Sequence, residues 1–341
     1  MLAAVYYNNN DVRIEQRPIP EITDKEILVK MHSCGICGSD VMEWYRIKTA
    51  PRVLGHEMTG EIVKVGAGVK KFSVGQRVFV SHHVPCNSCK YCFYGNHTAC
   101  RTLHTTNYDP GGFAEYIRIP AINVDRGVFI LPDSVSYDEG VFIEPLGCVI
   151  RSQELIDIRK GQSILVMGCG VSGILHIQLA RMLGAGNIIA TNNREFRRNA
   201  ALRFGADYAI TPKEATVDNI RKLNNGELID RVIVSTGAVQ AAEQAFELID
   251  KGGVILFYAV PPPETRITVD INRLWRDDVT VKMSYAAAPS DLYKALQLIK
   301  SKRINVVDMI THRLPLKEAQ KGFKIAASSD ESLKVILYAE S

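Results

Sequence analysis

Residues 163–173 read SILVMGCGVSG. The apolar run that ends at Met167 predicts a buried strand, and the six residues after it fit the pattern G-x-G-x-x-G. Alone, this pattern is a weak signal. Here it follows a strand and opens an expected helix at residues 172–183, so it predicts a dinucleotide-binding turn.

Each position of this turn has a physical role in binding a dinucleotide. Gly168 would make the tight turn, Gly170 would let the backbone approach a pyrophosphate, and Gly173 would let helix and sheet pack closely. The first N–H groups of the helix, at Val171 and Ser172, would face the phosphates. The alternative is a glycine-rich turn that binds no nucleotide.

The end of the next expected strand, residues 187–191, bears on the choice of cofactor. An Asp or Glu there would hydrogen-bond the ribose 2′-OH of NAD, but the sequence places Asn192 at this point. Asn192 does not repel a 2′-phosphate, and Arg194, Arg197 or Arg198 could neutralise one. NADP is therefore allowed and slightly favoured over NAD, unless these arginines only form a solvated helix face.

The pattern of expected secondary structure changes between about residues 145 and 160. Before this point, short β runs separated by Gly and Pro are typical of a barrel-like β domain. After it, strands and helices alternate, which predicts a doubly wound parallel sheet. The expected strands are 27–30, 60–65, 77–80, 163–167, 187–191, 231–235, 254–258, 279–285 and 334–338, and the expected helices are 172–183, 195–204, 239–249 and 290–300.

Composition excludes several classes of protein. The chain has 341 residues, 46% hydrophobic and 23% charged, which fits a globular protein of two domains. Its net charge is only +4, so neither nucleic acid nor membrane is an expected partner. The first residues do not resemble a signal peptide and no apolar run could span a bilayer, so a cytoplasmic location is expected by default.

Four of the eight cysteines lie close together, as Cys86-x2-Cys89-x2-Cys92-x7-Cys100. In a reducing compartment, clustered thiols are more often metal ligands than disulfides. Four thiolates satisfy a tetrahedral zinc ion and leave no open position, so this site would be structural. An iron–sulfur cluster, or four unrelated buried cysteines, are the alternatives.

A second set of metal-binding side chains is dispersed along the chain. Cys37 and His56 offer a thiolate and an imidazole, and Glu57 and Glu144 offer carboxylates. A catalytic zinc takes three protein ligands and keeps one position open. Spacing alone does not show that these residues meet, because a lone histidine is more often structural and Cys34 with Cys37 could form a redox pair.

Several motifs occur here in the same order as in the zinc-containing medium-chain dehydrogenases, which the chain resembles over essentially its whole length. The closest resemblance is to the polyol (sorbitol-type) and threonine dehydrogenase branches. It implies an α/β fold with a GroES-like β-barrel catalytic domain at residues 1–147, a Rossmann domain with a doubly wound parallel sheet at 148–285, and a segment, 286–341, that returns to the first domain. The matching motifs are residues 35–40, 55–57, 86–100, 110–116, 142–146 and 168–173.

The resemblance also implies roles for individual residues. Cys37, His56 and either Glu57 or Glu144 would hold a catalytic zinc. Asp40 would be the acid that orients the histidine ligand, and Ser39 the hydroxyl that touches the substrate oxygen. Lys334 would be a basic residue that reaches the cofactor phosphates, and Arg197 would lie beside the adenosine ribose.

The sequence departs from many relatives at the proton relay. Where they carry a histidine three positions after the serine, this chain has Met42, which cannot carry a proton. The exit from Ser39 would then use the cofactor ribose, water or another group. His82, His83 and His104 could replace the missing histidine, although each is more simply explained as part of the scaffold.

Together these expectations describe an oxidoreductase with one catalytic and one structural zinc. It would transfer a hydride between NAD(P) and the CH–OH carbon of a polyol, sugar or related secondary alcohol. A threonine-type or simple-alcohol dehydrogenase is the nearest alternative; a zinc-free quinone reductase and a zinc-binding nucleic-acid module are remote ones. Relatives form dimers or tetramers, so a homo-oligomer is expected.

Trp44 either faces the substrate or packs within its loop.

Overall fold

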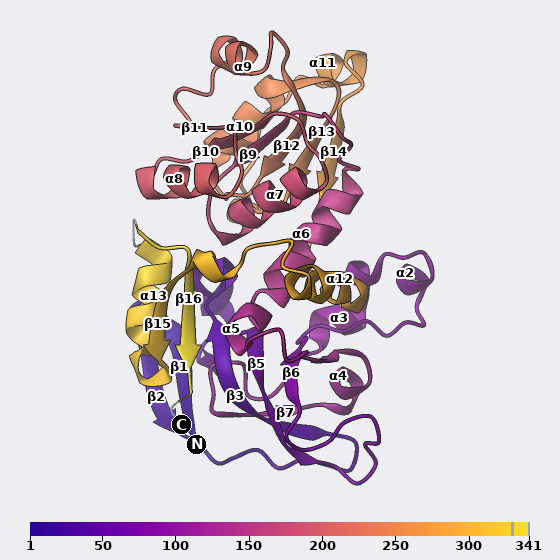
Figure 1. Ribbon diagram of the computed structural model, residues 1–341, viewed down its shortest axis with the longest axis vertical. Helices are drawn as coiled ribbons and strands as arrows, with labels where there is room; N and C mark the ends of the chain where they lie inside the picture. The colour runs from indigo at the N-terminus through magenta and orange to yellow at the C-terminus, as the bar shows by residue number, and fades with distance from the viewer. Residues whose placement is uncertain (329–330, 340–341) are drawn as a thin grey trace. The chain divides into compact units, whose positions relative to one another are not determined.

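The computed structural model describes residues 1–328 and 331–339, and the chain forms two compact units (Figure 1). One unit is Cys148–Tyr285, and the other combines Met1–Gly147 with Ala286–Ser341. One sheet lies in the first of these units and two lie in the other, and each unit has its own buried apolar core. The fold class expected from the sequence, a β-rich domain with a doubly wound parallel-sheet domain, is confirmed.

The unit Cys148–Tyr285 is built on a six-stranded parallel sheet of order β11-β10-β9-β12-β13-β14. The chain order reverses between β9 and β12, and at such a switch point doubly wound sheets bind their ligands. The strands are β9 (Ile164–Met167), β10 (Ile188–Thr191), β11 (Tyr208–Ile210), β12 (Ile229–Val234), β13 (Ile249–Phe257) and β14 (Thr280–Met283).

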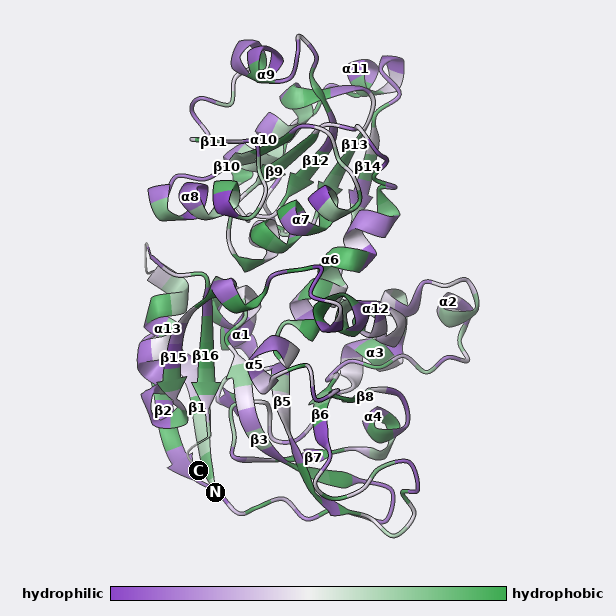
Figure 2. Ribbon diagram, viewed as in Figure 1, coloured by the Kyte–Doolittle hydropathy of each residue, from purple (hydrophilic) through white to green (hydrophobic). Residues whose placement is uncertain are grey.

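Burial explains why the middle strands of this sheet are short continuous apolar runs. Every residue of β9 and of β10 is buried, as expected for parallel strands covered on both faces. Figure 2 shows the central strands in the hydrophobic colour. The helices of this unit are α7 (Val171–Met182), α8 (Glu195–Arg203), α9 (Val217–Leu223), α10 (Val239–Leu248) and α11 (Ile271–Arg276), and α6 (Ile143–Leu155) begins in the other unit.

The second unit contains a seven-stranded sheet of order β15-β16-β3-β5-β6-β8, with β7 also paired to β3, and a three-stranded sheet of order β2-β1-β4. Pairing is antiparallel except between β15 and β16. The strands are β1 (Leu2–Asn8), β2 (Asp11–Gln16), β3 (Ile27–Gly35), β4 (Arg52–Val53), β5 (Glu57–Val65), β6 (Arg77–Val80), β7 (Tyr116–Ile119), β8 (Val128–Ile130), β15 (Ile310–Pro315) and β16 (Lys334–Tyr338).

Short helices connect these strands, and many of them carry the polar residues discussed below. The α-helices are α1 (Glu43–Arg46), α2 (Lys90–Phe93), α3 (Arg101–Thr105), α4 (Ala121–Arg126), α5 (Tyr137–Gly140), α12 (Pro289–Lys300) and α13 (Ala319–Ser328). The 3-10 helices are η1 (Gly38–Val41), η2 (Ile47–Thr49), η3 (His97–Ala99), η4 (Val307–Met309) and η5 (Leu316–Glu318).

The last strand of the chain lies beside one of the first. β16 pairs antiparallel with β3, and β3 pairs antiparallel with β5, so three strands from distant parts of the sequence are neighbours. The register places Ile336 opposite Gly35, and Gly35 opposite Glu57. The end of β3 and the beginnings of β5 and β16 bring together the polar residues of one candidate site. Within the described residues, no helix is both long and apolar enough to cross a bilayer.

Candidate metal centres and dinucleotide site

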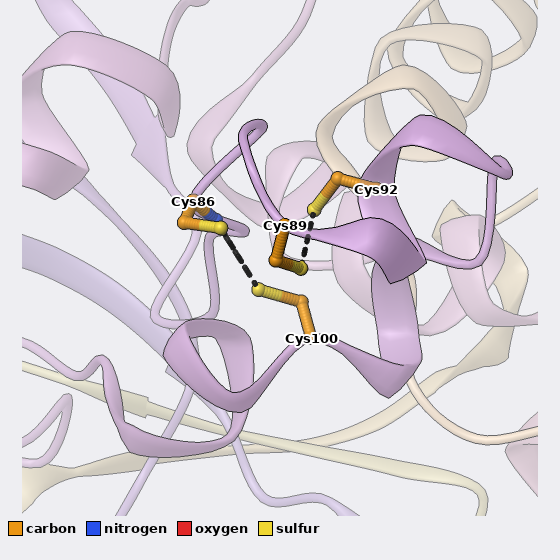
Figure 3. A group of neighbouring side chains, drawn as sticks. All are labelled: Cys86, Cys89, Cys92 and Cys100. Carbon is orange, nitrogen blue, oxygen red and sulfur yellow. Dashed lines mark hydrogen bonds between the residues drawn. The ribbon is translucent and has the colours of Figure 1, made fainter.

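The four clustered cysteines point toward one another in a loop that folds around them (Figure 3). Their four sulfurs lie within 4.8 Å of one another, and the Cys86–Cys100 and Cys89–Cys92 sulfur pairs are each 3.6 Å apart. Zinc–sulfur bonds of about 2.3 Å arranged as a tetrahedron require sulfur–sulfur distances of about 3.8 Å. The geometry therefore fits a tetrahedral metal ion.

Backbone N–H groups support the thiolate form of this cluster. Ser88 N donates to the Cys86 sulfur (3.5 Å), and Cys86 N donates to the Cys100 sulfur (3.3 Å). The Ser88 N–H group is the main reason that the pKa of the Cys86 thiol lies below its usual value. Asn87 and Gly95 have positive φ angles, 59° and 76°, which let the loop turn tightly around the sulfurs.

A second candidate centre lies where β3 ends and β5 begins. Cys37 caps the N-terminus of η1, and its sulfur accepts a hydrogen bond from Ser39 N (3.4 Å). Cys37, His56 and Glu57 each offer one ligand atom, and these atoms lie within 4.8 Å of one another. Glu144, in the first turn of α6, is not part of this group, but its charge acts on the nearby Lys334 and Tyr108.

Gly35 makes the room that Glu57 occupies. A Cβ atom at position 35 would lie 2.1 Å from Oε2 of Glu57 and 2.7 Å from a methyl group of Val141. Only glycine allows the carboxylate to lie over the end of β3.

Glu57 forms a buried ion pair with Lys334, the first residue of β16. The Lys334 Nζ–Glu57 Oε2 distance is 2.5 Å, and both side chains are 1% exposed. Burial lowers the pKa of Lys334 and the Glu57 carboxylate raises it, with a net rise. The other Glu57 oxygen, Oε1, is buried and has no hydrogen-bond partner among the described residues. An unpartnered carboxylate oxygen beside a thiol and an imidazole fits a metal ligand.

This pairing bears on one expectation. The resemblance implied that Lys334 reaches the cofactor phosphates; in the structure its ammonium group is buried and held by Glu57 and by the carbonyl oxygen of Ile36. The contact of Lys334 with the phosphates stays a prediction.

Asp40 connects Cys37 and His56. Its Oδ2 accepts a hydrogen bond from Cys37 N (3.0 Å), and its Oδ1 lies 3.5 Å from His56 Nδ1. Burial lowers the pKa of His56, but the charges of Asp40 and Cys37 raise it well above its usual value. Because Nδ1 faces Asp40, Nε2 remains for a metal ion, the arrangement in which a carboxylate fixes a ligating imidazole.

Arg46, at the end of α1, contacts Ser39 twice. Its Nη2 donates to Ser39 Oγ and its Nε donates to the Ser39 carbonyl oxygen, both at 2.9 Å. The same guanidinium lies 3.5 Å from Asp40. Sequence reasoning missed this residue, because no local pattern links it to Ser39.

Other polar groups lie near His56 without partners. The ring centroids of His56 and His82 are 4.9 Å apart, and those of His82 and Tyr108 are 6.3 Å apart. Nδ1 of His82 and the hydroxyl of Tyr108 are buried without a hydrogen-bond partner in the described chain, as is Nδ1 of His83. His104, in contrast, is exposed on α3 and contacts the Thr98 carbonyl oxygen (2.8 Å).

The glycine turn of residues 168–173 joins β9 to α7 in the other unit. Gly168 has a φ of 101°, and a Cβ atom at Gly173 would lie 1.9 Å from the Gly168 carbonyl oxygen. A Cβ at Gly170 would meet nothing within 4 Å, so the start of α7 is open to a ligand. Gly170 is the N-cap of α7, and no side chain caps this end, so the first N–H groups at Val171 and Ser172 can face phosphates.

Arginines cluster where β10 leads into α8. Asn192 follows β10 directly, and its Oδ1 accepts a hydrogen bond from Arg194 N (2.9 Å). Arg198 donates to the Asn192 and Asn193 carbonyl oxygens at 3.0 and 2.8 Å. Arg197 and Arg198 act electrostatically on Cys169, so their charges lie near the glycine turn.

Comparison with known proteins agrees with this geometry. Residues 23–132 match the alcohol dehydrogenase GroES-like domain, and residues 172–301 match the zinc-binding dehydrogenase family. The chain is 32% identical to sorbitol dehydrogenase of Gallus gallus, over 98% of this chain and 96% of the relative. The chain belongs to the zinc-containing medium-chain dehydrogenase family. The expectation of an NAD(P)-dependent zinc dehydrogenase is thereby confirmed.

Other members of this family are similarly related to the chain. It is 33% identical to L-threonine 3-dehydrogenase of Escherichia coli, over 94% of each chain. The alcohol dehydrogenase of Thermus sp. ATN1 superposes with a TM-score of 0.89 at 27% identity, covering 100% of each chain. A structure from Sinorhizobium meliloti 1021 bound to NADP superposes with a TM-score of 0.88 at 26% identity, covering 99% of this chain and 98% of that one.

Proposed function

We propose that this dehydrogenase interconverts the CH–OH carbon of a polyol, sugar or related secondary alcohol with the corresponding carbonyl, using NAD(P). The observation that carries the proposal is the group of Cys37, His56 and Glu57, beside which Nδ1 of His82 and the hydroxyl of Tyr108 are buried without partners. Buried polar groups are costly unless they gain hydrogen bonds. A substrate with several hydroxyl groups would supply them.

The chain would hold one catalytic and one structural zinc ion. The structural ion would take Cys86, Cys89, Cys92 and Cys100. The catalytic ion would take Cys37, His56 and Glu57, with Glu144 as the alternative carboxylate. Bound zinc supplies Lewis acidity toward the substrate oxygen, and a bound nicotinamide supplies the hydride acceptor.

The residues around this centre would position the substrate and move its proton. Ser39 Oγ would accept the proton of the substrate hydroxyl, with Arg46 holding the serine in place through its 2.9 Å hydrogen bond. Arg46 itself is always protonated and cannot accept the proton. Met42 cannot either, so the proton would leave through the cofactor ribose, water or another group. Asp40 would fix the orientation of His56.

The pyrophosphate of the cofactor would lie on the turn of residues 168–173, and NADP would be preferred to NAD. Asn192 stands where an acidic residue would repel a 2′-phosphate, and Arg198 donates to its carbonyl oxygen. Arg194 and Arg197 lie close in the sequence, and guanidinium groups bind phosphate well.

The closest competing activity is threonine-type or simple-alcohol oxidation, and one screen separates these possibilities. Zinc-loaded enzyme is assayed with polyols, inositols, aldoses, threonine and simple alcohols, each with NAD and NADP, by the absorbance of the reduced nicotinamide. We expect polyols or sugars to have the highest kcat/KM. Preferred turnover of threonine or of simple alcohols would refute the proposed substrate class.

Metal analysis tests the catalytic centre. Cys37→Ser should lose one zinc per chain and nearly all turnover, whereas Cys148→Ser, a buried cysteine outside both clusters, should keep both. A zinc-free quinone reductase would instead show the same metal content and turnover in Cys37→Ser as in the unaltered enzyme.

A homo-oligomer is expected, and the edge of the parallel sheet offers a surface for it. β14 is the last strand of that sheet, and all four of its residues are exposed, including Met283. Trp275 in α11 is 77% exposed. Unpaired strand edges with apolar side chains tend to pair with another chain. Met283→Lys should therefore shift sedimentation toward smaller species. Unchanged sedimentation would exclude this strand edge as the oligomer interface.

The expected cytoplasmic location stays a prediction.

A further inference from the structure

Ser39 is held by three hydrogen bonds, which leave its hydroxyl hydrogen free. Its N–H donates to the sulfur of Cys37 at 3.4 Å. Its carbonyl oxygen accepts from Nε of Arg46, and its Oγ accepts from Nη2 of the same guanidinium, both at 2.9 Å. Within residues 1–328 and 331–339, no group accepts a hydrogen bond from the Ser39 hydroxyl. A hydroxyl carries one hydrogen and two lone pairs, so Oγ keeps its hydrogen and one lone pair for other partners.

Arg46 fixes the orientation of this hydroxyl. Nε and Nη2 belong to one planar, rigid group, so turning the Ser39 side chain away from it would break a charged hydrogen bond. The guanidinium is itself held, because its central carbon lies 4.7 Å from the ring centroid of Tyr45 and Nη2 lies 3.5 Å from Oδ1 of Asp40. The Arg46 side chain is only 16% exposed. The directions left to the free hydrogen and the free lone pair are therefore restricted.

Arg46 also lies one turn after the residue that stands in the place of a relay histidine. Met42 is the N-cap of α1, and the N–H group of Arg46, the last residue of that helix, donates to the Met42 carbonyl oxygen at 3.0 Å. The thioether of Met42 has no proton to exchange, and a guanidinium does not lose its proton in proteins. Arg46 can therefore supply only one part of a relay, which is a fixed hydrogen bond to the serine.

We infer that Arg46 is the positioning residue for proton transfer at Ser39, so that the serine works without a relay histidine. This inference rests on the proposed function. During oxidation the substrate O–H bond breaks as its proton binds the free lone pair of Ser39 Oγ. The original Oγ–H bond breaks in the same step and its proton passes to water, so the serine ends neutral, while the carbinol C–H bond supplies the hydride of the reaction. Arg46 stays protonated throughout and only orients the hydroxyl.

The test uses zinc-loaded enzyme, its best alcohol substrate and its preferred cofactor. Arg46→Gln keeps a polar side chain but loses the rigid pair of charged donors. Its kcat should fall about 10- to 100-fold with KM changed less than about 3-fold, because a positioned proton acceptor contributes about 10²–10⁴ in rate and only its orientation is lost. The solvent deuterium isotope effect on kcat should increase, since proton transfer becomes slower. Arg46→Lys, which keeps one charged donor, should have an intermediate kcat.

A double-mutant cycle separates this role from a purely structural one. Ser39→Ala removes the Oγ through which the arginine acts, so adding Arg46→Gln should lower kcat by no more than about 2-fold further. Each variant should keep the zinc content of the unaltered enzyme. Arg13→Gln is the matched control, because Arg13 also lies over a tyrosine ring, 4.2 Å from the centroid of Tyr7, but pairs with Asp11 instead of a serine. Its kcat should be unchanged.

Three results overturn the inference while the unaltered enzyme remains active. They are an unchanged kcat in Arg46→Gln, rate losses that multiply fully in the cycle with Ser39→Ala, and loss of zinc from Arg46→Gln, which would place the role of the arginine at Asp40. If Arg46→Gln does not fold, Arg46→Lys replaces it in the cycle.

The activity of the unaltered enzyme separates failure of the inference from failure of the proposed function. No turnover of any alcohol with either cofactor overturns the proposed function and the inference with it. Turnover of threonine or of simple alcohols alone refutes the proposed substrate class, and the cycle between Ser39 and Arg46 on that substrate still decides the inference.

Discussion

Replacing Lys334 by methionine should destabilise the zinc-free protein much more than the zinc-loaded one. Lys334 and Glu57 are both 1% exposed and 2.5 Å apart, so without zinc the variant buries an uncompensated carboxylate. Breaking such a pair costs about 3–5 kcal/mol. If Glu57 also binds the catalytic zinc, the ion neutralises it, and the loaded variant should lose only about 1.5–3 kcal/mol for the missing charged hydrogen bonds.

The assay is chemical unfolding of both forms, after a mild chelator has removed the zinc with an open coordination position and left the four-cysteine site filled. Zinc content per chain verifies each preparation. Lys302→Met is the matched control: it breaks the ion pair of a 57% exposed lysine with Glu139, and should cost the same small amount, under about 1 kcal/mol, in both forms. Equal destabilisation of zinc-free and zinc-loaded Lys334→Met would refute the reasoning and assign the third ligand to Glu144.

Three other predictions concern separate parts of the chain. Cys92→Ser should lose one zinc per chain and make the loop of residues 86–100 sensitive to proteases, whereas unchanged zinc content would refute a four-cysteine site. Asn192→Asp should lower kcat/KM for NADP about 10-fold or more and favour NAD, because its carboxylate repels a 2′-phosphate; an unchanged cofactor ratio would place the selectivity elsewhere. Burial lowers the pKa of His176 from 6.5 to about 3. The unfolded chain therefore binds this proton first as the pH falls below 6.5, and the group should remove about 2 kcal/mol of unfolding free energy between pH 8 and pH 5. His176→Asn should flatten this part of the pH dependence in denaturant titrations, and an unaltered slope would show that the imidazole is not kept neutral.

Local patterns were sufficient to predict the elements of the parallel sheet whose residues are fully buried. The expected strand 163–167 is found as β9 and 187–191 as β10, because continuous burial on both faces demands continuous apolar sequence. The same reasoning missed β11 and α9. β11 is only three residues long and half-exposed, and α9 follows it after a polar turn, so neither has a pattern that stands out.

The four-cysteine site could be predicted because all its ligands come from one loop, and spacing along the chain then translates into distance. Arg46 could not be predicted in this way. Its significance depends on its contacts with Ser39 and Asp40, and in the sequence such an arginine looks the same as one on a solvated surface.

Lys334 shows what a motif does not predict. The sequence around a position predicts its strand, but the contacts of its side chain depend on which strands lie beside it. The register of β16, β3 and β5 aligns Ile336 with Gly35 and Gly35 with Glu57, so a lysine two residues before Ile336 lies on the same face and meets the carboxylate. Lys334 and Glu57 are 277 residues apart in the chain, and only the absence of a side chain at Gly35 lets them touch. If Glu57 binds the proposed catalytic zinc, the charge of Lys334 competes with that ion for the carboxylate and lowers the affinity of Glu57 for it.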